Sequence, residues 1–363
     1  MQTVAVHLGS RSYQVQISTG LLHELGESAR TALGQSARHA IVVSNATVAS
    51  LYGDPVVRSL ARADFKTHRF SIGDGERFKS LRTAESLFAF LIERRVERAD
   101  VIVALGGGVV GDLAGFVAAT YLRGIRLIQV PTTLLAQIDS SVGGKTGVNH
   151  RLGKNLIGAF HQPSLVAIDP DVLHTLPARQ MQAGLYEAIK YGIISDRRLF
   201  NRVARNIEDL KNLDSAELEH LIARCCGIKA RVVRIDEHES GLRRILNFGH
   251  TVGHALEAVT GYRRFLHGEA VGIGMRAASR IAERLGLLPA VKRKAIEMAI
   301  ASVGRLPTAN TLALDDIISA MNRDKKVEAG RAAFVLPVEI GEVVIRTDVP
   351  PKVVKAALKD SLA

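Results

Sequence analysis

The sequence has few cysteines, few aromatic residues and no long hydrophobic run. Cys225 and Cys226 are its two cysteines, and they are adjacent. A disulfide between neighbours is strained and rare, and two thiols are too few for a zinc–thiolate cluster, so we expect a reduced protein of the cytoplasm. No apolar run approaches the roughly 20 residues that span a bilayer. The first 18 residues also lack the pattern of a signal peptide, so we expect neither membrane insertion nor secretion.

The charge balance of the sequence is basic. Lysine and arginine number 48 and aspartate and glutamate 36, which gives a formal net charge of +12. Such a balance suits nucleic acid, a membrane surface or a small anion. The cations are scattered, aromatic residues make up only 5%, and no known nucleic-acid-binding motif occurs. This favours a small phosphorylated or carboxylated partner over nucleic acid or a membrane, although charge alone does not select it.

The chain is long enough, at 363 residues, for two domains, and its hydrophobic pattern changes near Pro177. Before Pro177, two alternating runs at 3–8 and 13–18 predict an antiparallel hairpin. Fully apolar runs divided by helical segments predict a parallel sheet that is covered on both faces. The runs lie at 39–45, 64–70, 99–108, 125–133 and 164–169, and the helical segments at 83–96 and 111–122.

Helical periodicity dominates after Pro177. The predicted helices lie at 183–194, 197–207, 216–233, 249–259, 268–286, 290–304 and 351–362, with short strands at 332–337 and 342–347. The predicted architecture is an α/β domain at 1–177 and a mainly α-helical domain at 178–363. A cleft between two such domains is a common place for a ligand.

A glycine-rich turn follows the apolar run at 99–108. Gly106, Gly108 and Gly111 satisfy G-x-G-x-x-G between a predicted strand and a predicted helix. Glycine lets the backbone approach a pyrophosphate, and the helix N-terminus offers N–H groups to it. No Asp or Glu stands about 20 residues downstream, so any ribose contact must come from elsewhere. A tight turn without a ligand is the alternative.

Two further loops, "GDGERFKS" at 73–80 and "VPTTLLAQIDSSVGGKTGVNHRLGKN" at 130–155, also follow predicted strands. Carboxyl ends of parallel strands face the cofactor crevice of such domains. The side chains suited to a nucleotide or to anionic oxygens are Asp74, Glu76, Lys79, Thr132, Thr133, Lys145, Lys154 and Asn155. Ordinary solvated loops are the alternative, but three such loops in one domain favour a nucleotide site.

The helical half contains candidate metal ligands. His250 and His254 stand four residues apart, so both rings leave one helix face. Glu187 and Lys190 lie in an apolar helical segment, where a buried carboxylate needs a partner such as a metal ion. Spacing alone suggests that both histidines bind the ion, with Glu187 and His267 as further candidates for a three-ligand zinc site. A surface ion pair and structural histidines are the alternatives. Further donors that also suit ordinary surface positions are Lys229, Arg243, Asn247, Lys325 and Lys326.

With these motifs in this order, the chain resembles the 3-dehydroquinate synthase family of sugar phosphate cyclases over nearly its whole length. The matching segments are "GDGERFK", "LGGGVVGDLAGF", "RGIRLIQVPTTLLAQIDSSVGGKTGVN", "GKNLIGAFHQP", "EAIKYG", "LNFGHTVGHALE", "HGEAV" and "DKK". The resemblance implies a Rossmann-like NAD-binding α/β domain, a mainly α-helical metal-binding domain and a homodimer. Tyr186 departs from the small residue that the family more often has before its metal-binding glutamate.

The resemblance also implies site residues. It makes Glu187, His250 and His267 the ligands of zinc or cobalt, so that His254 faces the substrate instead of the metal. The implied NAD contacts are Asp74, Gly75, Glu76, Arg77, Phe78, Lys79, Gly108, Val109, Val110, Gly111, Asp112, Thr132, Thr133, Lys145, Lys154, Val172, Leu173, His174 and Thr175. The implied substrate contacts are Arg123, Asp139, Lys145, Asn155, Lys190, Lys229, Arg243, Asn247, His254 and either Lys325 or Lys326.

The implied reaction converts 3-deoxy-D-arabino-heptulosonate 7-phosphate to 3-dehydroquinate and phosphate in the shikimate pathway. It combines oxidation at C5 by recycled NAD, phosphate elimination, re-reduction, ring opening and aldol closure. Arg243 would hold the carboxylate in a bidentate fork, and His254 would transfer a proton at the C5 oxygen. A sister cyclase acting on sedoheptulose 7-phosphate or glucose 6-phosphate, an NAD dehydrogenase of the glycerol dehydrogenase type and a basic nucleic-acid-binding module are the alternatives.

Overall fold

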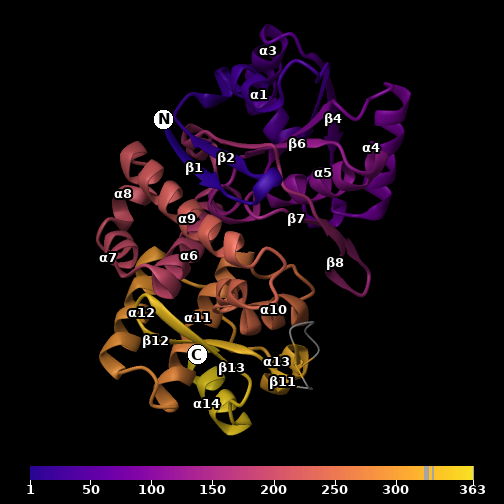
Figure 1. Cartoon of the computed structure of the whole chain (residues 1–363). Coiled ribbons are helices and arrows are strands. Elements are labelled where there is room, and N and C mark those ends of the chain that lie inside the picture. Colours follow the sequence, from indigo (N-terminus) through magenta and orange to yellow (C-terminus); the bar gives the residue numbers. More distant parts are fainter. Residues whose placement is uncertain (323–326, 329–330, 363) are drawn as a thin grey trace. The chain divides into compact units, whose positions relative to one another are not determined.

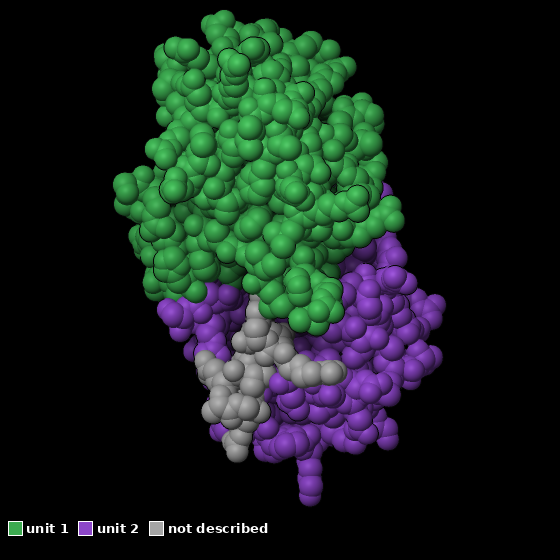
Figure 2. Space-filling view, turned by 90° about the vertical axis from the view of Figure 1, so that its right-hand side faces the viewer, with its two compact units in different colours: residues 1–176, 218–238 green, residues 177–217, 239–363 purple. Residues whose placement is uncertain are grey.

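The computed structural model describes residues 1–322, 327–328 and 331–362. The chain forms two compact units, which Figure 2 colours separately. Unit 1 comprises Met1–Leu176 and Leu218–His238, and unit 2 comprises Pro177–Glu217 and Glu239–Ala363. Within the described ranges, every helix is too short or too polar to span a bilayer.

Unit 1 is built on a seven-stranded sheet with the order β1-β2-β9-β6-β5-β3-β4. Figure 1 labels β1, β2, β4 and β6 of this sheet. β1 pairs antiparallel with β2, and the other neighbours pair in parallel. The strands are β1 (Gln2–Val6), β2 (Tyr13–Ile17), β3 (His39–Asn45), β4 (Lys66–Ile72), β5 (Val101–Gly106), β6 (Arg126–Pro131) and β9 (Leu165–Ile168). The predicted hairpin and parallel sheet are therefore confirmed.

Helices cover both faces of this sheet because its strands are apolar on both sides. Along β3, Ala40 and Val42 pack in one hydrophobic cluster, while Ile41 and Val43 pack in another. The first cluster includes residues of α1 and α3, and the second includes residues of α4 and α5. The helices of unit 1 that precede Pro177 are α1 (Leu25–Leu33), α2 (Ala46–Val48), α3 (Asp54–Arg62), α4 (Leu81–Glu93) and α5 (Gly108–Thr120).

The sequence predicts a loop at 130–155, but the second part of this segment belongs to a hairpin. Residues 145–160 form an antiparallel hairpin of β7 (Lys145–His150) and β8 (Gly153–Phe160). The sequence does not predict this hairpin, because its strands are polar and contain glycine, and such residues are uncommon in strands. Gly158 is required there, since a Cβ would lie 2.2 Å from the carbonyl oxygen of Thr146 on the paired strand.

Unit 2 is mainly helical, as predicted. Its helices are α6 (Ala178–Ser195), α7 (Arg197–Arg205), α8 (Ile207–Lys211), α10 (His250–Val259), α11 (His267–Arg284), α12 (Ala290–Val303), α13 (Leu314–Asn322) and α14 (Pro351–Leu362). Its short strands are β10 (Val327–Glu328), β11 (Arg331–Ala332), β12 (Phe334–Glu339) and β13 (Glu342–Arg346).

Helix α9 (Ser215–Ile235) differs from the predicted domain division. The sequence places it in the second domain, whereas Leu218–His238 belongs to unit 1. The cause is its packing against the π-helical turn η6 (Ala136–Ser140). Cys226 Sγ donates to the carbonyl oxygen of Gln137 at 3.3 Å, and Lys229 Nζ donates to that of Asp139 at 2.6 Å.

Candidate metal centre and nucleotide site

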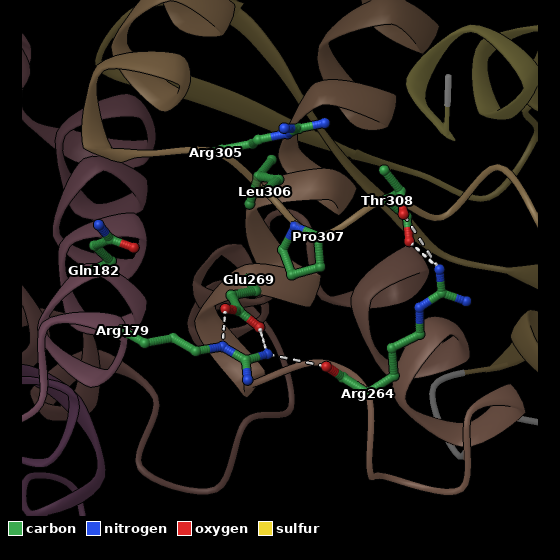
Figure 3. A pocket seen from close by; sticks show the side chains of 8 residues that line it. All are labelled: Arg179, Gln182, Arg264, Glu269, Arg305, Leu306, Pro307 and Thr308. Carbon is green, nitrogen blue, oxygen red and sulfur yellow. Dashed lines mark hydrogen bonds and ion pairs between the residues drawn. The ribbon is translucent and has the colours of Figure 1, made fainter.

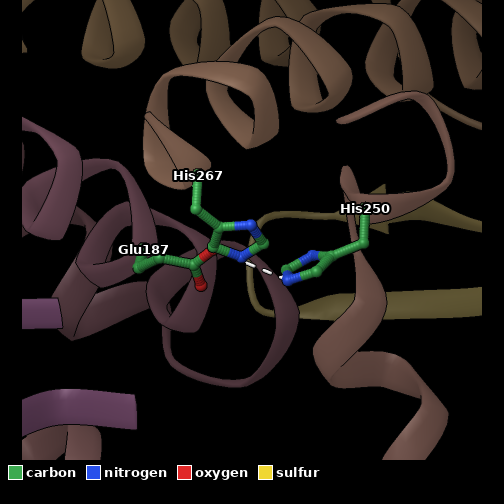
Figure 4. Close-up of side chains that lie close together, drawn as sticks. All are labelled: Glu187, His250 and His267. Atoms are coloured by element: carbon green, nitrogen blue, oxygen red, sulfur yellow. Dashed lines mark ion pairs between the residues drawn. The ribbon is translucent and has the colours of Figure 1, made fainter. Parts of the chain in front are cut away.

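Three helices of unit 2 bring one carboxylate and two imidazoles together. Glu187 lies on α6, His250 begins α10 and His267 begins α11. The three side chains point toward one another (Figure 4), and one ligand atom of each lies within 4.8 Å of the others. Nε2 of His250 and Nε2 of His267 are each 3.6 Å from Oε1 of Glu187. One carboxylate and two imidazoles form a ligand set that catalytic zinc uses.

The three helices approach closely because glycines stand at their contacts. A Cβ on Gly268 would lie 1.9 Å from the carbonyl oxygen of Ala183 on α6. A Cβ on Gly274 would lie 1.9 Å from the carbonyl oxygen of Gly249, directly before α10. Both distances are far below any real carbon–oxygen contact. Helix α11 can therefore pack against both neighbours only where these side chains are absent.

Glu187 is well suited to a cation. Its side chain is fully buried, and Lys190, one turn later and also buried, forms an ion pair with it. Neither carboxylate oxygen accepts a hydrogen bond of normal geometry from a described residue. A buried carboxylate without hydrogen bonds is costly, and a divalent ion would compensate its charge. The residues present therefore fit a metal ion.

His254 lies beside this group without joining it. Its ring centroid is 5.3 Å from that of His250 and 5.9 Å from that of His267. The ligand atoms of His254, Glu257 and His267 form a second, overlapping group within 4.8 Å of one another. The spacing of His250 and His254 thus places both rings on one face, but the Glu187 group contains only the first of them.

Two of the other predicted substrate residues of unit 2, Arg243 and Asn247, lie on one short element. Arg243 belongs to the short 3-10 helix η8 (Leu242–Asn247) and is only 1% exposed. Nδ2 of Asn247 donates to Oε1 of Glu239 at 2.8 Å. Sequence reasoning missed Glu239. Lys325 and Lys326 lie outside the described residues.

Most of the predicted nucleotide residues of unit 1 follow the carboxyl ends of parallel strands of one sheet. Asp74–Lys79 follows β4, Gly108–Asp112 begins α5 directly after β5, Thr132 and Thr133 follow β6, and Val172–Thr175 follows β9. This is the edge at which doubly wound sheets bind dinucleotides. The N-cap of α5, Gly107, provides no side-chain hydrogen bond. Oγ1 of Thr132 is buried and has no hydrogen-bond partner among the described residues. Uncapped N–H groups and an unsatisfied hydroxyl at one sheet edge fit a phosphate-containing cofactor.

A buried lysine connects the glycine turn to the predicted substrate residues of unit 1. Lys79 forms an ion pair with Asp112 and donates to Oδ1 of Asn155 at 2.5 Å. Burial raises the pKa of Asp112, and the ammonium of Lys79 opposes this effect. A second pair links the two loops: Nζ of Lys154 is 3.9 Å from Oε1 of Glu76.

The four further predicted residues of unit 1 are Lys229, Asp139, Lys145 and Arg123. Lys229 forms an ion pair with Asp139, so the structure brings these two together. Lys145 is exposed at the start of β7. Arg123 is exposed just beyond the C-terminal end of α5, about 20 Å of helix length from the glycine turn. The structure therefore does not bring Arg123 to the glycine turn of the same chain.

A surface pocket of unit 2 has a volume of about 600 Å³ and contains none of the predicted site residues (Figure 3). Its lining consists of Arg179, Gln182, Arg264, Glu269, Arg305, Leu306, Pro307 and Thr308. Glu269 Oε2 accepts from the N–H of Leu266 at 2.7 Å, and Arg179 Nε donates to Oε1 at 2.6 Å. These bonds stabilise the first turn of α11, so this pocket supports the helix that carries His267.

Tyr186, the departure from the family pattern, has a packing role. Its hydroxyl donates to the carbonyl oxygen of Gly304 at 3.1 Å, and burial raises its pKa to about 12. Its ring lies close enough to α11 that a Cβ on Gly272 would be 3.2 Å from Cδ1. The larger side chain therefore packs between α6 and α11, and Glu187 keeps its place.

Comparison with known proteins shows the family of this chain. The N-terminal 3-dehydroquinate synthase family matches residues 69–183, and the C-terminal family matches residues 184–327. The chain is 51% identical to a 3-dehydroquinate synthase of Gloeobacter violaceus over 99% of both chains. Among solved structures it is similar to 2-epi-5-epi-valiolone synthase of Streptomyces hygroscopicus with NAD+ and Zn2+ bound (TM-score 0.88, 31% identity, 98% of both chains). It is also similar to 2-deoxy-scyllo-inosose synthase with carbaglucose-6-phosphate, NAD+ and Co2+ (TM-score 0.86, 27% identity, 99% of this chain and 100% of the other). The chain belongs to the 3-dehydroquinate synthase family.

Proposed function

We propose that this chain converts 3-deoxy-D-arabino-heptulosonate 7-phosphate to 3-dehydroquinate and phosphate, with NAD and a divalent metal ion as cofactors. The observation that carries the proposal is the convergence of Glu187, His250 and His267 in a chain 51% identical to a 3-dehydroquinate synthase over 99% of its length. The presence of NAD+ with Zn2+ or Co2+ in two similar cyclases supports both cofactors.

The metal ion would be held by Glu187, His250 and His267. Bound there, it would act as a Lewis acid that lowers the pKa of a substrate hydroxyl and polarises the ketone at C5. His254 lies next to two of these ligands and is partly exposed, so it is our candidate for proton transfer at the C5 oxygen.

NAD would bind in unit 1 at the carboxyl ends of β4, β5, β6 and β9. The free N–H groups at the start of α5 would face the pyrophosphate, and Thr132 would donate its unsatisfied hydroxyl. When bound there, NAD would supply reversible hydride transfer at C5, so no net formation of NADH is expected.

The cations and amides of the site would bind an anionic sugar phosphate. Arg243, a residue only 1% exposed, would pair with the substrate carboxylate through two parallel hydrogen bonds, a geometry that lysine cannot offer. The residues that we assign to the phosphate are Lys145, Asn155 and a lysine at 325 or 326. The residues that we assign to the substrate hydroxyls are Lys190, Lys229 and Asn247.

One assay distinguishes this function from that of a sister cyclase or an NAD dehydrogenase. The purified chain is incubated with zinc, a catalytic amount of NAD and, in turn, the heptulosonate phosphate, sedoheptulose 7-phosphate and glucose 6-phosphate. We expect phosphate and 3-dehydroquinate from the first substrate alone, without net NADH. Turnover of either other sugar would indicate a sister cyclase, and NADH formed in proportion to product would indicate a dehydrogenase.

We further propose that the chain acts in the cytoplasm as a homodimer. The family resemblance supports the homodimer, and two buried cysteines in no disulfide suit a reducing compartment such as the cytoplasm. Light scattering coupled to size-exclusion chromatography tests the assembly: the expected mass is twice 39.2 kDa, and a monomeric mass would contradict it.

A further inference from the structure

Glu257 has a contact that its place in the sequence does not reveal. It lies on α10, seven residues after His250, and its side chain is 6% exposed. Its Oε2 is 3.1 Å from Nδ1 of His267. The other ring nitrogen of His267 is the one that lies 3.6 Å from Glu187. The imidazole of His267 therefore stands between two carboxylates, with one nitrogen toward each.

The two contacts assign the hydrogen on this ring. An ionised carboxylate only accepts hydrogen bonds, so Nδ1 of neutral His267 donates to Glu257 and Nε2 keeps its lone pair. His250 follows the same rule, because its Nδ1 is 3.1 Å from the carbonyl oxygen of Phe248, which also only accepts. In both histidines the lone pair is thus left on the nitrogen that lies near Glu187.

We propose that Glu257 is a positioning residue for the metal centre, which fixes the orientation and tautomer of His267 and thereby raises the affinity for the divalent ion. The proposal rests on the metal site of the proposed function. A carboxylate behind a ligating histidine orients the ring and makes it a stronger ligand. Of the two histidines near Glu187, His267 has this charged acceptor, whereas His250 has a neutral carbonyl.

The same geometry argues against a second ion in the overlapping group of His254, Glu257 and His267. That ion would need a nitrogen of His267. Nε2 lies toward Glu187, and Nδ1 carries the hydrogen that Glu257 accepts. The arrangement therefore predicts one ion per chain, with Glu257 outside its coordination shell.

Metal affinity tests the proposal independently of activity. Zinc dissociation constants are measured by competition with a chromophoric chelator for the wild-type chain, Glu257→Ala and Glu257→Gln, together with the zinc stoichiometry and the visible spectrum of the cobalt-loaded protein. The matched control is Glu283→Gln, which removes a carboxylate of α11 that pairs with Arg293 at 3.0 Å and does not touch an imidazole.

We expect Glu257→Ala to bind zinc about 10–100-fold more weakly than wild type, with an altered cobalt spectrum. Glu257→Gln keeps an oxygen that can accept from Nδ1, so it should recover part of this loss and bind about 3–10-fold more weakly. If Glu257→Ala does not fold, the zinc affinity of Glu257→Gln tests the proposal by itself. Glu283→Gln should bind like wild type, with an unchanged spectrum.

Three results would overturn the proposal. The first is wild-type zinc affinity in both Glu257 variants, and the second is a loss of zinc affinity in Glu283→Gln equal to that in the Glu257 variants. The third is a stoichiometry of two zinc ions per wild-type chain, of which Glu257→Ala loses one. A wild-type chain that binds no divalent ion would instead overturn the proposed function itself, and this inference with it.

Discussion

The substitution Gly268→Ala tests whether the close approach of α11 to α6 builds the metal centre. On the present backbone the new Cβ would lie 1.9 Å from the carbonyl oxygen of Ala183, whereas real contacts of a Cβ essentially never fall below 3.0 Å. The helices must therefore separate by about 1.1 Å, the difference between these distances. His267 precedes the substituted residue and Glu187 is on the opposite helix, so the separation moves one ligand away from the other.

We expect Gly268→Ala to lower both the stability of the chain and its affinity for the metal ion. Overpacking costs about 1–3 kcal/mol, and replacing a helical glycine by alanine returns up to about 1 kcal/mol. The net loss in the free energy of unfolding is then at most about 3 kcal/mol. Ligand distances must stay within about 0.2 Å of their ideal values, so we expect zinc affinity to fall at least about tenfold.

Urea unfolding and zinc competition measure the two effects of Gly268→Ala. The control is Gly227→Ala on α9, where an added Cβ would meet nothing within 4 Å. It should leave zinc affinity unchanged and unfold at the same or a slightly higher urea concentration. Wild-type zinc affinity in Gly268→Ala would refute the argument that this glycine sets the geometry of the site.

Three further predictions concern single side chains. Glu187→Ala should lose bound metal by mass spectrometry and all phosphate release, and full turnover of metal-free protein would contradict this. Arg243→Lys should lower kcat/KM for the heptulosonate phosphate about 10–100-fold, which corresponds to one charged hydrogen bond of about 1.5–3 kcal/mol; wild-type kinetics would exclude the bidentate role. Burial raises the pKa of Cys226 to about 12, and Cys225 is equally buried, so neither thiol should react with a disulfide reagent at pH 8 until the chain unfolds. Rapid labelling of either thiol in the folded chain would contradict their burial.

Most elements of the fold follow from local periodicity. The parallel strands were predictable because they are apolar on both faces, and the helices of unit 2 because their apolar positions recur every three to four residues. Periodicity shows which residues are buried but not what covers them. For that reason the sequence does not reveal that α9 packs against η6, where Cys226 and Lys229 contact the backbone of Gln137 and Asp139.

The sequence predicts which types of residue form the candidate site, but it says little about how they are arranged in space. Spacing places His250 and His254 on one helix face, yet a metal ion needs ligands from directions that one helix does not supply. His250, Glu187 and His267 come from three helices whose separation depends on glycine contacts, which spacing does not encode. Glu257 was missed, although a glutamate within the apolar segment "HALEAV" is itself a signal of a buried carboxylate with a specific partner.

Anomalous diffraction at the zinc edge, from crystals grown with zinc and NAD, tests the central claim most directly. We expect one strong peak per chain, about 2.0–2.2 Å from a carboxylate oxygen of Glu187 and from Nε2 of His250 and His267, with Glu257 still hydrogen-bonded to His267. A peak bound by His254 and Glu257 instead of Glu187, or no peak at these residues in crystals that release phosphate from the heptulosonate phosphate, would contradict the claim.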